Sequence, residues 1–419
     1  MKVLWLAHAI PYPPKAGYLS RSYHLLRELT REHRVDLVAF VQEQWLTTLF
    51  ANRDEGLEES RSALGEFCQS VTFLPIDSVG RFLGKQRTAL RALIGSSAYK
   101  TYTTSWLQSH SANSVIRRLA HTGGYDLVHV DTIGLAPYRE LSPRLPATLT
   151  HHNIESHMML RRADNSGNFV ARSYFRTEGR RLRKYEQEAA THFGAHITCS
   201  ELDADRFREI VPDANIVVVP NGVDCEFFAP RGQQTRPNSI VFVGTMNWYP
   251  NVQAVSYLLR EVWPVLKSVV PTATLDVAGS NPPDSIVRMA RALPDVTIHG
   301  YLPDVRPLID SAAVFACPIQ DGGGTKLKIL DAFAMEKCVV AHPIACEGIQ
   351  IVPGHNVVLA SSPQQFVAEI SSLLADDIRR KALGRAAREL VQTQYSYREI
   401  GARFRETLED AARRYSTPH

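Results

Sequence analysis

A run of three glycines followed by a threonine and two lysines lies within the segment DGGGTKLKILDAF, residues 321–333. Successive glycines such as Gly323 and Gly324 allow neighbouring backbone N–H groups to point into one concavity. The apolar helix that we expect to follow Thr325 would add the positive end of its dipole. These residue types, in this order, predict a phosphate-binding loop, with an ordinary loop and solvated lysines as the alternative.

The two lysines of this segment are in an unusual place. Lys326 and Lys328 are expected in the first turn of the helix, where a cation is disfavoured by about 0.3–1 kcal/mol unless an anion lies nearby. Residues two apart point to different sides of a helix, so we expect only one of these lysines to face the phosphates. Asp331, on the same helix, is a carboxylate that could face a ribose. Together these residues predict a site for a nucleoside diphosphate, although the spacing is not that of a Walker A loop.

The bulk properties are those of a globular protein of ordinary composition. The chain has 419 residues, 44% hydrophobic and 21% charged, a length that favours two domains. A formal charge of +4 is too small to indicate nucleic-acid binding by itself. The six cysteines form no C-x-x-C pair, so we expect neither a zinc site nor a disulfide framework, and a reducing, cytoplasmic compartment. The N-terminus is interpreted as a buried strand rather than a signal peptide, and no apolar run approaches the ~20 residues of a membrane span.

Strands and helices are predicted to alternate along both halves of the chain. In the first half, strands are expected at Val3–Ala7, Val35–Phe40, Val71–Leu74, Leu127–Val130, Ala147–Thr150 and His196–Cys199. After a Pro-, Gly- and Asn-rich linker, they are expected at Ile240–Val243, Thr274–Ala278, Val296–His299, Val314–Ala316 and Val339–Ala341. This alternation predicts an α/β protein with two Rossmann-like, doubly wound domains. Because ligands of such sheets bind beyond the carboxyl ends of the strands, we expect the loops that follow the strands to line one cleft between the domains.

Five short motifs occur in a fixed order along the chain. They are PPKAG in the first loop, CSELD after a strand, PNGVD before the linker, FVGTMN at the start of the second half, and GGGTKLKILDAFAM. In this ordered set the chain resembles, over nearly its whole length, the retaining GT-B glycosyltransferases of family 4, in particular bacterial cell-surface polysaccharide sugar transferases. The resemblance implies an N-terminal acceptor-binding domain, 1–212, and a C-terminal donor-binding domain, 213–396. It also implies that the C-terminal helix, 397–419, packs back on the first domain.

The resemblance assigns donor-binding positions to this sequence. Asp331 matches the second acid of the family's motif of two glutamates separated by seven residues, the acid that binds ribose hydroxyls. The first acid falls on Gly323, with Asp321 as a substitute for the missing carboxylate. Asn247 and Trp248 stand where the family often has a basic residue, which leaves the diphosphate charge to Lys326 or Lys328. By the same resemblance, Tyr301 and Leu302 hold the base through backbone groups. Gly17 and Gly244 allow the backbone to approach the diphosphate closely.

His152, in the HHN segment after the Ala147–Thr150 strand, matches a family position close to the transferred sugar. The alternative is a polar loop histidine. Glu155 is expected either to orient His152 or to cap the helix that begins there. Arg161 and Arg162 could meet an acceptor phosphate or form a solvated face.

The resemblance implies transfer of a monosaccharide from a nucleotide-diphosphate sugar to a hydroxyl acceptor with retention of anomeric configuration. The acceptor would be a glycan, a lipid-linked glycan or a small molecule, and neither a metal nor another cofactor is expected. Two basic stretches, 81–100 and 172–184, favour peripheral contact with an anionic membrane at its inner face, with ordinary solvated helix faces as the alternative. Two other functions fit the same domains: a nucleotide-sugar 2-epimerase, and a non-catalytic nucleotide-sugar-binding protein suggested by the missing first glutamate.

Overall fold

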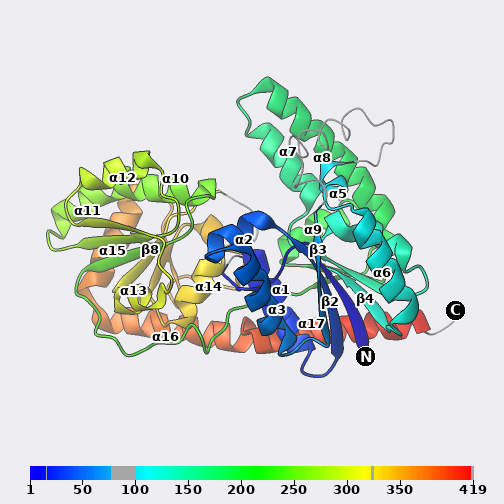
Figure 1. The fold of residues 1–419 in the computed structure, drawn as a ribbon. Coiled ribbons are helices and arrows are strands. Elements are labelled where there is room, and N and C mark those ends of the chain that lie inside the picture. Colours follow the sequence, from blue (N-terminus) through cyan, green and yellow to red (C-terminus); the bar gives the residue numbers. More distant parts are fainter. Residues whose placement is uncertain (16, 77–100, 322–324, 417–419) are drawn as a thin grey trace. The chain divides into compact units, whose positions relative to one another are not determined.

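The computed structural model describes residues 1–15, 17–76, 101–321 and 325–416. They form two compact units, one of Met1–Pro220 with the residues from Ile400 onward, and one of Asn221–Glu399 (Figure 1). Each unit is a parallel sheet with covering helices, which confirms the predicted α/β class with two Rossmann-like domains. The basic stretch 81–100, together with Gly323 and Gly324, lies outside the described residues.

The first sheet has seven strands in the order β3-β2-β1-β4-β5-β6-β7, and every neighbouring pair is parallel. Its order reverses between β1 and β4, where the loops that leave the two strands diverge and a ligand can enter. The strands are nearly continuous apolar runs, as expected for a sheet covered on both faces. Their bounds are β1 (Lys2–Ala7), β2 (Arg34–Val41), β3 (Ser70–Pro75), β4 (Leu127–Val130), β5 (Ala147–His151), β6 (Ala195–Thr198) and β7 (Ile216–Val218).

The helices of the first unit pack their apolar sides on this sheet. Helix α1 buries Leu25, Leu26 and Leu29. Arg21 of the same helix is buried, and its guanidinium donates to the carbonyls of Val219 and Pro220, each at 2.7 Å. The described helices are α1 (Gly17–Leu29), α2 (Glu43–Leu49), α3 (Arg53–Gly65), α5 (Tyr102–Ser105), α6 (His110–Thr122), the 3-10 helix η1 (Ile133–Leu141), α7 (Glu155–Asp164), α8 (Phe169–Ala190) and α9 (Glu201–Arg208).

The last helix, α17 (Tyr397–Ser416), contributes its greater part to the first unit. Its apolar side joins the core that includes Trp5 of β1. Phe404 lies at the centre of this contact, with its ring 5.5 Å from that of Trp5 and 5.1 Å from that of His129. The first unit is therefore built from both ends of the chain.

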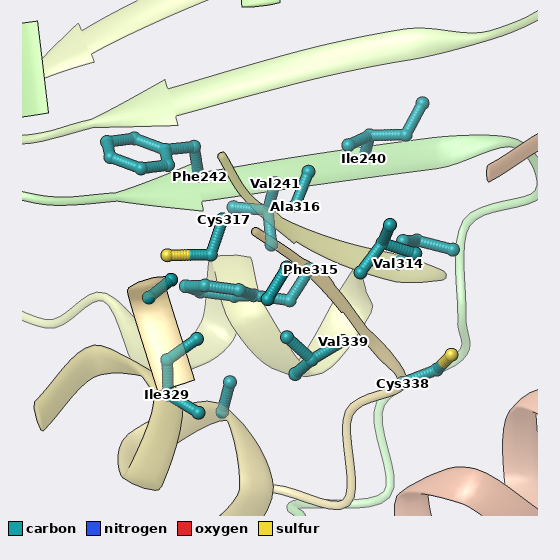
Figure 2. Close-up of a cluster of buried hydrophobic side chains, with 14 of the residues drawn as sticks. Ile240, Val241, Phe242, Val314, Phe315, Ala316, Cys317, Ile329, Cys338 and Val339 are labelled. Carbon is teal, nitrogen blue, oxygen red and sulfur yellow. The ribbon is translucent and has the colours of Figure 1, made fainter. Parts of the chain in front are cut away.

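The second sheet has six parallel strands in the order β10-β9-β8-β11-β12-β13. Its strands are β8 (Ser239–Val243), β9 (Thr274–Ala278), β10 (Val296–Gly300), β11 (Val314–Cys317), β12 (Val339–Ala341) and β13 (Val358–Leu359). Its helical segments are α10 (Tyr249–Tyr257), the π-helix η2 (Leu258–Val262), α11 (Trp263–Val269), α12 (Asp284–Arg291), α13 (Arg306–Ser311), α14 (Leu327–Ala334), the 3-10 helix η3 (Pro343–Cys346), α15 (Pro363–Ala375) and α16 (Asp377–Gln394). The order reverses between β8 and β11, and Figure 2 shows that Ile329 of α14 belongs to the apolar cluster formed around these strands.

Glycines let the loops after β8 and β9 pack backbone against backbone. A Cβ on Gly279 would lie 1.9 Å from the carbonyl oxygen of Gly244, so no larger residue fits there. Gly300, at the end of β10, has a φ of +67°, a conformation that favours glycine. Three successive strand ends are thus joined in one close-packed layer.

The strand predictions agree with the structure to within one or two residues at each end, and two short strands were missed. β7 has three residues and β13 has two, too few for a periodic signal. No helix within the described part of the chain is both long and apolar enough to cross a membrane.

We expect Phe404→Ala to lower the free energy of unfolding by about 3–5 kcal/mol, because truncation leaves a cavity between α17 and the sheet. Urea unfolding followed by circular dichroism measures the change. Glu406→Ala, at an exposed position on the same helix, is the control and should stay within about 0.5 kcal/mol of the parent protein. Equal effects of the two substitutions would contradict the packing of this helix.

Candidate active site

The sequence-predicted anion site lies at the start of α14, just beyond the end of β11. Lys326 occupies the N-cap position of this helix and its side chain is only 4% exposed. The prediction that both lysines lie in the first turn was therefore wrong for Lys326, because the helix begins one residue later, at Leu327. Lys328 does lie in that turn.

Lys328 contacts a residue of α10 and a residue of the central strand β8. Its ammonium group donates to Oδ1 of Asn251 in α10 and lies 4.7 Å above the ring of Phe242 in β8. A Cβ on Gly244 would lie 2.4 Å from this ammonium group, so the glycine makes room for the lysine. Burial lowers the pKa of Lys328 to about 8, and the charge of Lys326 also lowers it. An anion that binds beside such a lysine stabilises the charged form of its side chain.

Asp331 follows Lys328 by less than one turn of α14. Burial raises the pKa of its carboxyl group to about 7, and the charge of Lys328 opposes this shift. Both groups therefore titrate near neutral pH, where the charge of a bound ligand would strongly change their protonation. Perturbed titratable groups that cluster at a strand end are typical of functional sites.

The loop before α14 contributes further polar groups. The Thr325 hydroxyl is buried and makes no hydrogen bond within the described part of the chain. Asp321 is half-buried, and its carboxylate accepts a hydrogen bond of 2.7 Å from the hydroxyl of Tyr249. The buried hydroxyl of Thr325 is a donor that a bound anion could use.

The other predicted donor contacts of this unit follow β8 and β10. Gly244 directly follows β8, and Asn247 is exposed in the turn before α10. Tyr301, 53% exposed, and the half-buried Leu302 follow β10. The strand order β10-β9-β8-β11 thus places these residues and the start of α14 at the same edge of one sheet.

The predicted residues of the first unit lie at the carboxyl end of its sheet. Gly17 is the first residue of α1, and the ring of its neighbour Tyr18 lies 4.7 Å from that of His8. His152 follows β5, and its ring lies 5.7 Å from that of His8. Gly17 and His152 therefore belong to one region of this unit.

A buried carboxylate joins the two histidines. Oδ1 of Asp131, which follows β4, lies 3.3 Å from Nε2 of His152, and Oδ2 lies 3.8 Å from Nδ1 of His8. Burial, the largest single influence, would lower the pKa of His152, but the charge of Asp131 and the polar contacts with Asp131 and Cys199 together raise this pKa to about 9. Burial lowers the pKa of His8 to about 4, against the opposing charge of Asp131. The cluster thus carries one imidazolium and one neutral imidazole at neutral pH.

The adjacent residues have different roles. His151 is a core residue of β5, and its Nε2 lies 3.1 Å from Nδ1 of His196. Glu155 opens α7, with Ile154 in the cap position, and burial raises the pKa of its carboxyl group to about 7. Arg161 is half-buried and Arg162 is exposed on the same helix.

Neither Asp131 nor Asn251 was predicted from the sequence. Asp131 comes directly after the predicted strand at Leu127–Val130, and Asn251 belongs to the PN pair after the TMN turn. A polar residue at the end of a strand was the available signal, but many strands end in this way.

Two family profiles match this chain. A profile described as "Glycosyl transferases group 1" matches residues 237–376, and one described as "Glycosyltransferase Family 4" matches residues 20–227. The chain belongs to the GT-B glycosyltransferases. It is accordingly a transferase that moves sugars.

Solved structures agree with the GT-B fold over nearly the whole chain. Sucrose-phosphate synthase from Thermosynechococcus elongatus is 13% identical, with a TM-score of 0.70 over 98% of this chain and 99% of that one. Anabaena HepE in complex with UDP-glucose is 14% identical, with a TM-score of 0.65 over 98% and 100%. S. aureus TarM, in complex with fondaparinux, alpha-GlcNAc-glycerol and UDP, is 14% identical, with a TM-score of 0.67 over 99% and 100%.

A similar curated protein comes from Klebsiella pneumoniae, where it is described as an uncharacterized 44.6 kDa protein in the cps region. It is 24% identical over 169 residues, a match that spans 39% of this chain and 44% of the relative. The chain thus spans less than half the length of this relative.

We expect one lysine signal in an NMR pH titration to show a midpoint near 8, because burial disfavours the charged form of Lys328. An unperturbed lysine titrates near ~10.4. The signal should disappear in Lys328→Met and persist in Lys381→Met, a change at an exposed side chain of α16. A Lys328 signal with the unperturbed midpoint would contradict the buried environment described above.

Proposed function

We propose that this glycosyltransferase moves a monosaccharide from a nucleotide-diphosphate sugar to a hydroxyl of a glycan or lipid-linked glycan, with retention of anomeric configuration. The observation that carries the proposal is the clustering of the buried Lys326 with the half-buried Lys328 and Asp331, both with shifted pKa values, at the start of α14. Buried charges of this kind need a compensating partner, and a diphosphate with its ribose supplies one.

The central task of such a transfer is to stabilise the charge that grows on the departing diphosphate. In this proposal, N–H groups at the start of α14 and the ammonium group of Lys328 contact the phosphate oxygens. Lys326 adds positive charge, and Thr325 donates its hydroxyl hydrogen. The positions of these groups are fixed before the reaction, so little reorganisation is required as charge develops.

The rest of the donor would extend along the same edge of the second sheet. Asp331 accepts hydrogen bonds from the ribose hydroxyls, and the residues after β10, Tyr301 and Leu302, hold the base. Asp321 takes the position of the missing first glutamate, beside the sugar. We propose that His152 of the first unit contacts the transferred sugar, with Gly17 allowing backbone to approach the diphosphate.

We further propose that the transfer requires no metal, because lysines and amides supply the charge that a metal would otherwise provide. The incoming hydroxyl would lose its proton to a phosphate oxygen as the sugar bond breaks. No separate general base is then required.

The similar proteins suggest which donor and which acceptor class to test first. Two of the similar structures hold UDP or UDP-glucose, and a partial relative is encoded in a cps region. We therefore propose a uridine nucleotide sugar as the first donor to test, and a growing cell-surface polysaccharide as the acceptor class.

With a matching donor and glycan acceptor, we expect release of free nucleoside diphosphate and a product with the anomeric configuration of the donor. Coupled nucleotide detection and NMR of the product measure the two results. Lys328→Met should lower kcat/KM by about 100-fold, because it removes a charge that stabilises the leaving group. Excess EDTA should leave the rate unchanged.

Lys381→Met, at an exposed side chain, is the matched control and should keep the parental rate. Formation of a new nucleotide sugar without acceptor would indicate a 2-epimerase. Tight nucleotide-sugar binding without turnover, over a full panel of donors and acceptors, would indicate a non-catalytic binding protein. An inverted product would contradict retention.

Peripheral membrane contact is a separate part of the proposal. α7 and α8 pack side by side as a hairpin in the first unit (Figure 1). Phe169 and Val170, at the start of α8, are 80% and 74% exposed. Exposed basic residues follow on the same helix, at Arg172, Arg176, Arg180 and Lys184. Apolar side chains beside several cations suit the interface of an anionic membrane.

We expect the protein to float with liposomes that contain anionic lipid, and to float less as salt screens the basic residues. Replacing Phe169 and Val170 together with serine should reduce flotation strongly, because both side chains lose their apolar contact. Ile378→Ser removes an exposed apolar side chain, 82% exposed, from α16 and serves as the control. Absence of binding to anionic liposomes at physiological salt would remove this part of the proposal.

A further inference from the structure

Two side-chain hydrogen bonds cross the point where the strand order of the second sheet reverses. The hydroxyl of Tyr249 donates to Oδ2 of Asp321 at 2.7 Å. The ammonium group of Lys328 donates to Oδ1 of Asn251. Tyr249 and Asn251 belong to the first turn of α10, which follows β8, whereas their partners follow β11. The start of α10 therefore contacts both an acid and a cation of the candidate active site.

The turn that precedes Tyr249 is held by hydrogen bonds on two sides. The hydroxyl oxygens of Thr245 and Ser280 lie 2.8 Å apart, and the N–H of Met246 donates to the carbonyl of Ser280 at 2.9 Å. The side-chain amide of Asn251 donates to the carbonyl of Thr245 at 2.7 Å. The backbone that carries Tyr249 is thus anchored both to the loop after β9 and to its own helix.

Asp321, in contrast, lies in the loop between β11 and α14. Groups on loops are held less precisely than groups on helices and strands, and a short side chain gains precision from a hydrogen bond to a more rigid element. Tyr249 is 51% exposed, so its ring contributes little to the core. The hydrogen bond from Tyr249 therefore orients an acid at the edge of the sheet rather than supporting the fold.

This edge is where a doubly wound sheet binds its ligand. The loops after β8 and β11 diverge because the strand order reverses between these two strands. Lys328, which we assign to the diphosphate, lies at the same point, so Asp321 is well placed for the sugar that adjoins the diphosphate. An ionised carboxylate has about four acceptor positions, and it can therefore accept from Tyr249 and from sugar hydroxyls at the same time.

We propose that Tyr249 is a positioning residue that holds Asp321 against the hydroxyls of the donor sugar, and that the pair selects a neutral sugar over a uronic acid. This inference rests on the proposed function and specifies which sugars the same site takes. A carboxylate accepts hydrogen bonds from hydroxyls but repels the carboxylate of a uronate. An acid that is held in place discriminates more strongly, because it cannot move away from the second charge.

Equilibrium binding to the full-length protein tests this inference, with UDP, UDP-glucose, UDP-N-acetylglucosamine and UDP-glucuronic acid as probes. The better of the two neutral sugar nucleotides should bind at least about 10-fold more tightly than UDP-glucuronic acid. Tyr249→Phe removes only the hydroxyl and should lower the affinity for that neutral sugar nucleotide about 10-fold. Its affinity for UDP should stay at the parental value, a result that general disruption of the loop would not give.

A double-mutant cycle distinguishes positioning from a direct contact between Tyr249 and the sugar. Asp321→Ala removes the carboxylate and should weaken binding of the neutral sugar nucleotide at least as much as Tyr249→Phe. It should also reduce the discrimination against UDP-glucuronic acid. Because Tyr249 acts through Asp321, adding Tyr249→Phe to Asp321→Ala should cause no further loss.

Tyr415→Phe is the matched control. Tyr415 is similarly exposed, and its hydroxyl donates to the carbonyl of Pro143 at 3.2 Å within the first unit. This variant should bind every probe with the parental affinity. Circular dichroism verifies that each variant is folded.

The outcomes separate this inference from the proposed function. If UDP binds and Lys328→Met weakens it, but folded Tyr249→Phe binds the neutral sugar nucleotide like the parent, the inference alone is overturned. Additive losses in the double variant, or a preference for UDP-glucuronic acid, also overturn it. If neither UDP nor its sugars bind, the proposed uridine donor fails and the inference fails with it.

Discussion

The direction of the strands is the constraint on which both candidate sites depend. All strands of each sheet are parallel, so their carboxyl ends meet at one edge, and loops from distant parts of the sequence become neighbours there. The strand order reverses between β1 and β4 in one unit and between β8 and β11 in the other. His8 and Asp131 lie at the first of these points, and Lys328 lies at the second. Several groups with shifted pKa values thus lie at the places where the sheets leave room for ligands.

The two sites differ in what compensates their charged side chains. In the first unit, Asp131 balances the imidazolium of His152 within the protein, and this pair persists without any ligand. In the second unit, the ammonium group of Lys328 contacts the amide oxygen of Asn251 and the ring of Phe242, while burial lowers its pKa to about 8. Its charge is therefore incompletely compensated. A site of this type gains most when a polyanion binds, which is the physical basis of the proposed donor specificity.

Much of the fold could be predicted from the sequence, because each half alternates long apolar strands with amphipathic helices. The candidate anion site at the start of α14 was also predictable, since its glycines, lysines and aspartate lie close together in the chain. The cluster around Asp131 was not, because its three residues are more than a hundred positions apart at the extremes and meet only through the strand order β1-β4-β5. The position of Lys326 was missed by one residue, a difference that helix periodicity cannot resolve.

Hydrogen exchange with and without a uridine nucleotide tests the central claim most directly. Binding at the start of α14 should slow exchange in peptides that cover residues 325–335 and the turn after β8, while peptides from α17 remain unchanged. The account predicts that Lys328→Met abolishes this protection at the same nucleotide concentration. Protection confined to other segments, or protection of α14 that persists fully in the variant, would contradict it.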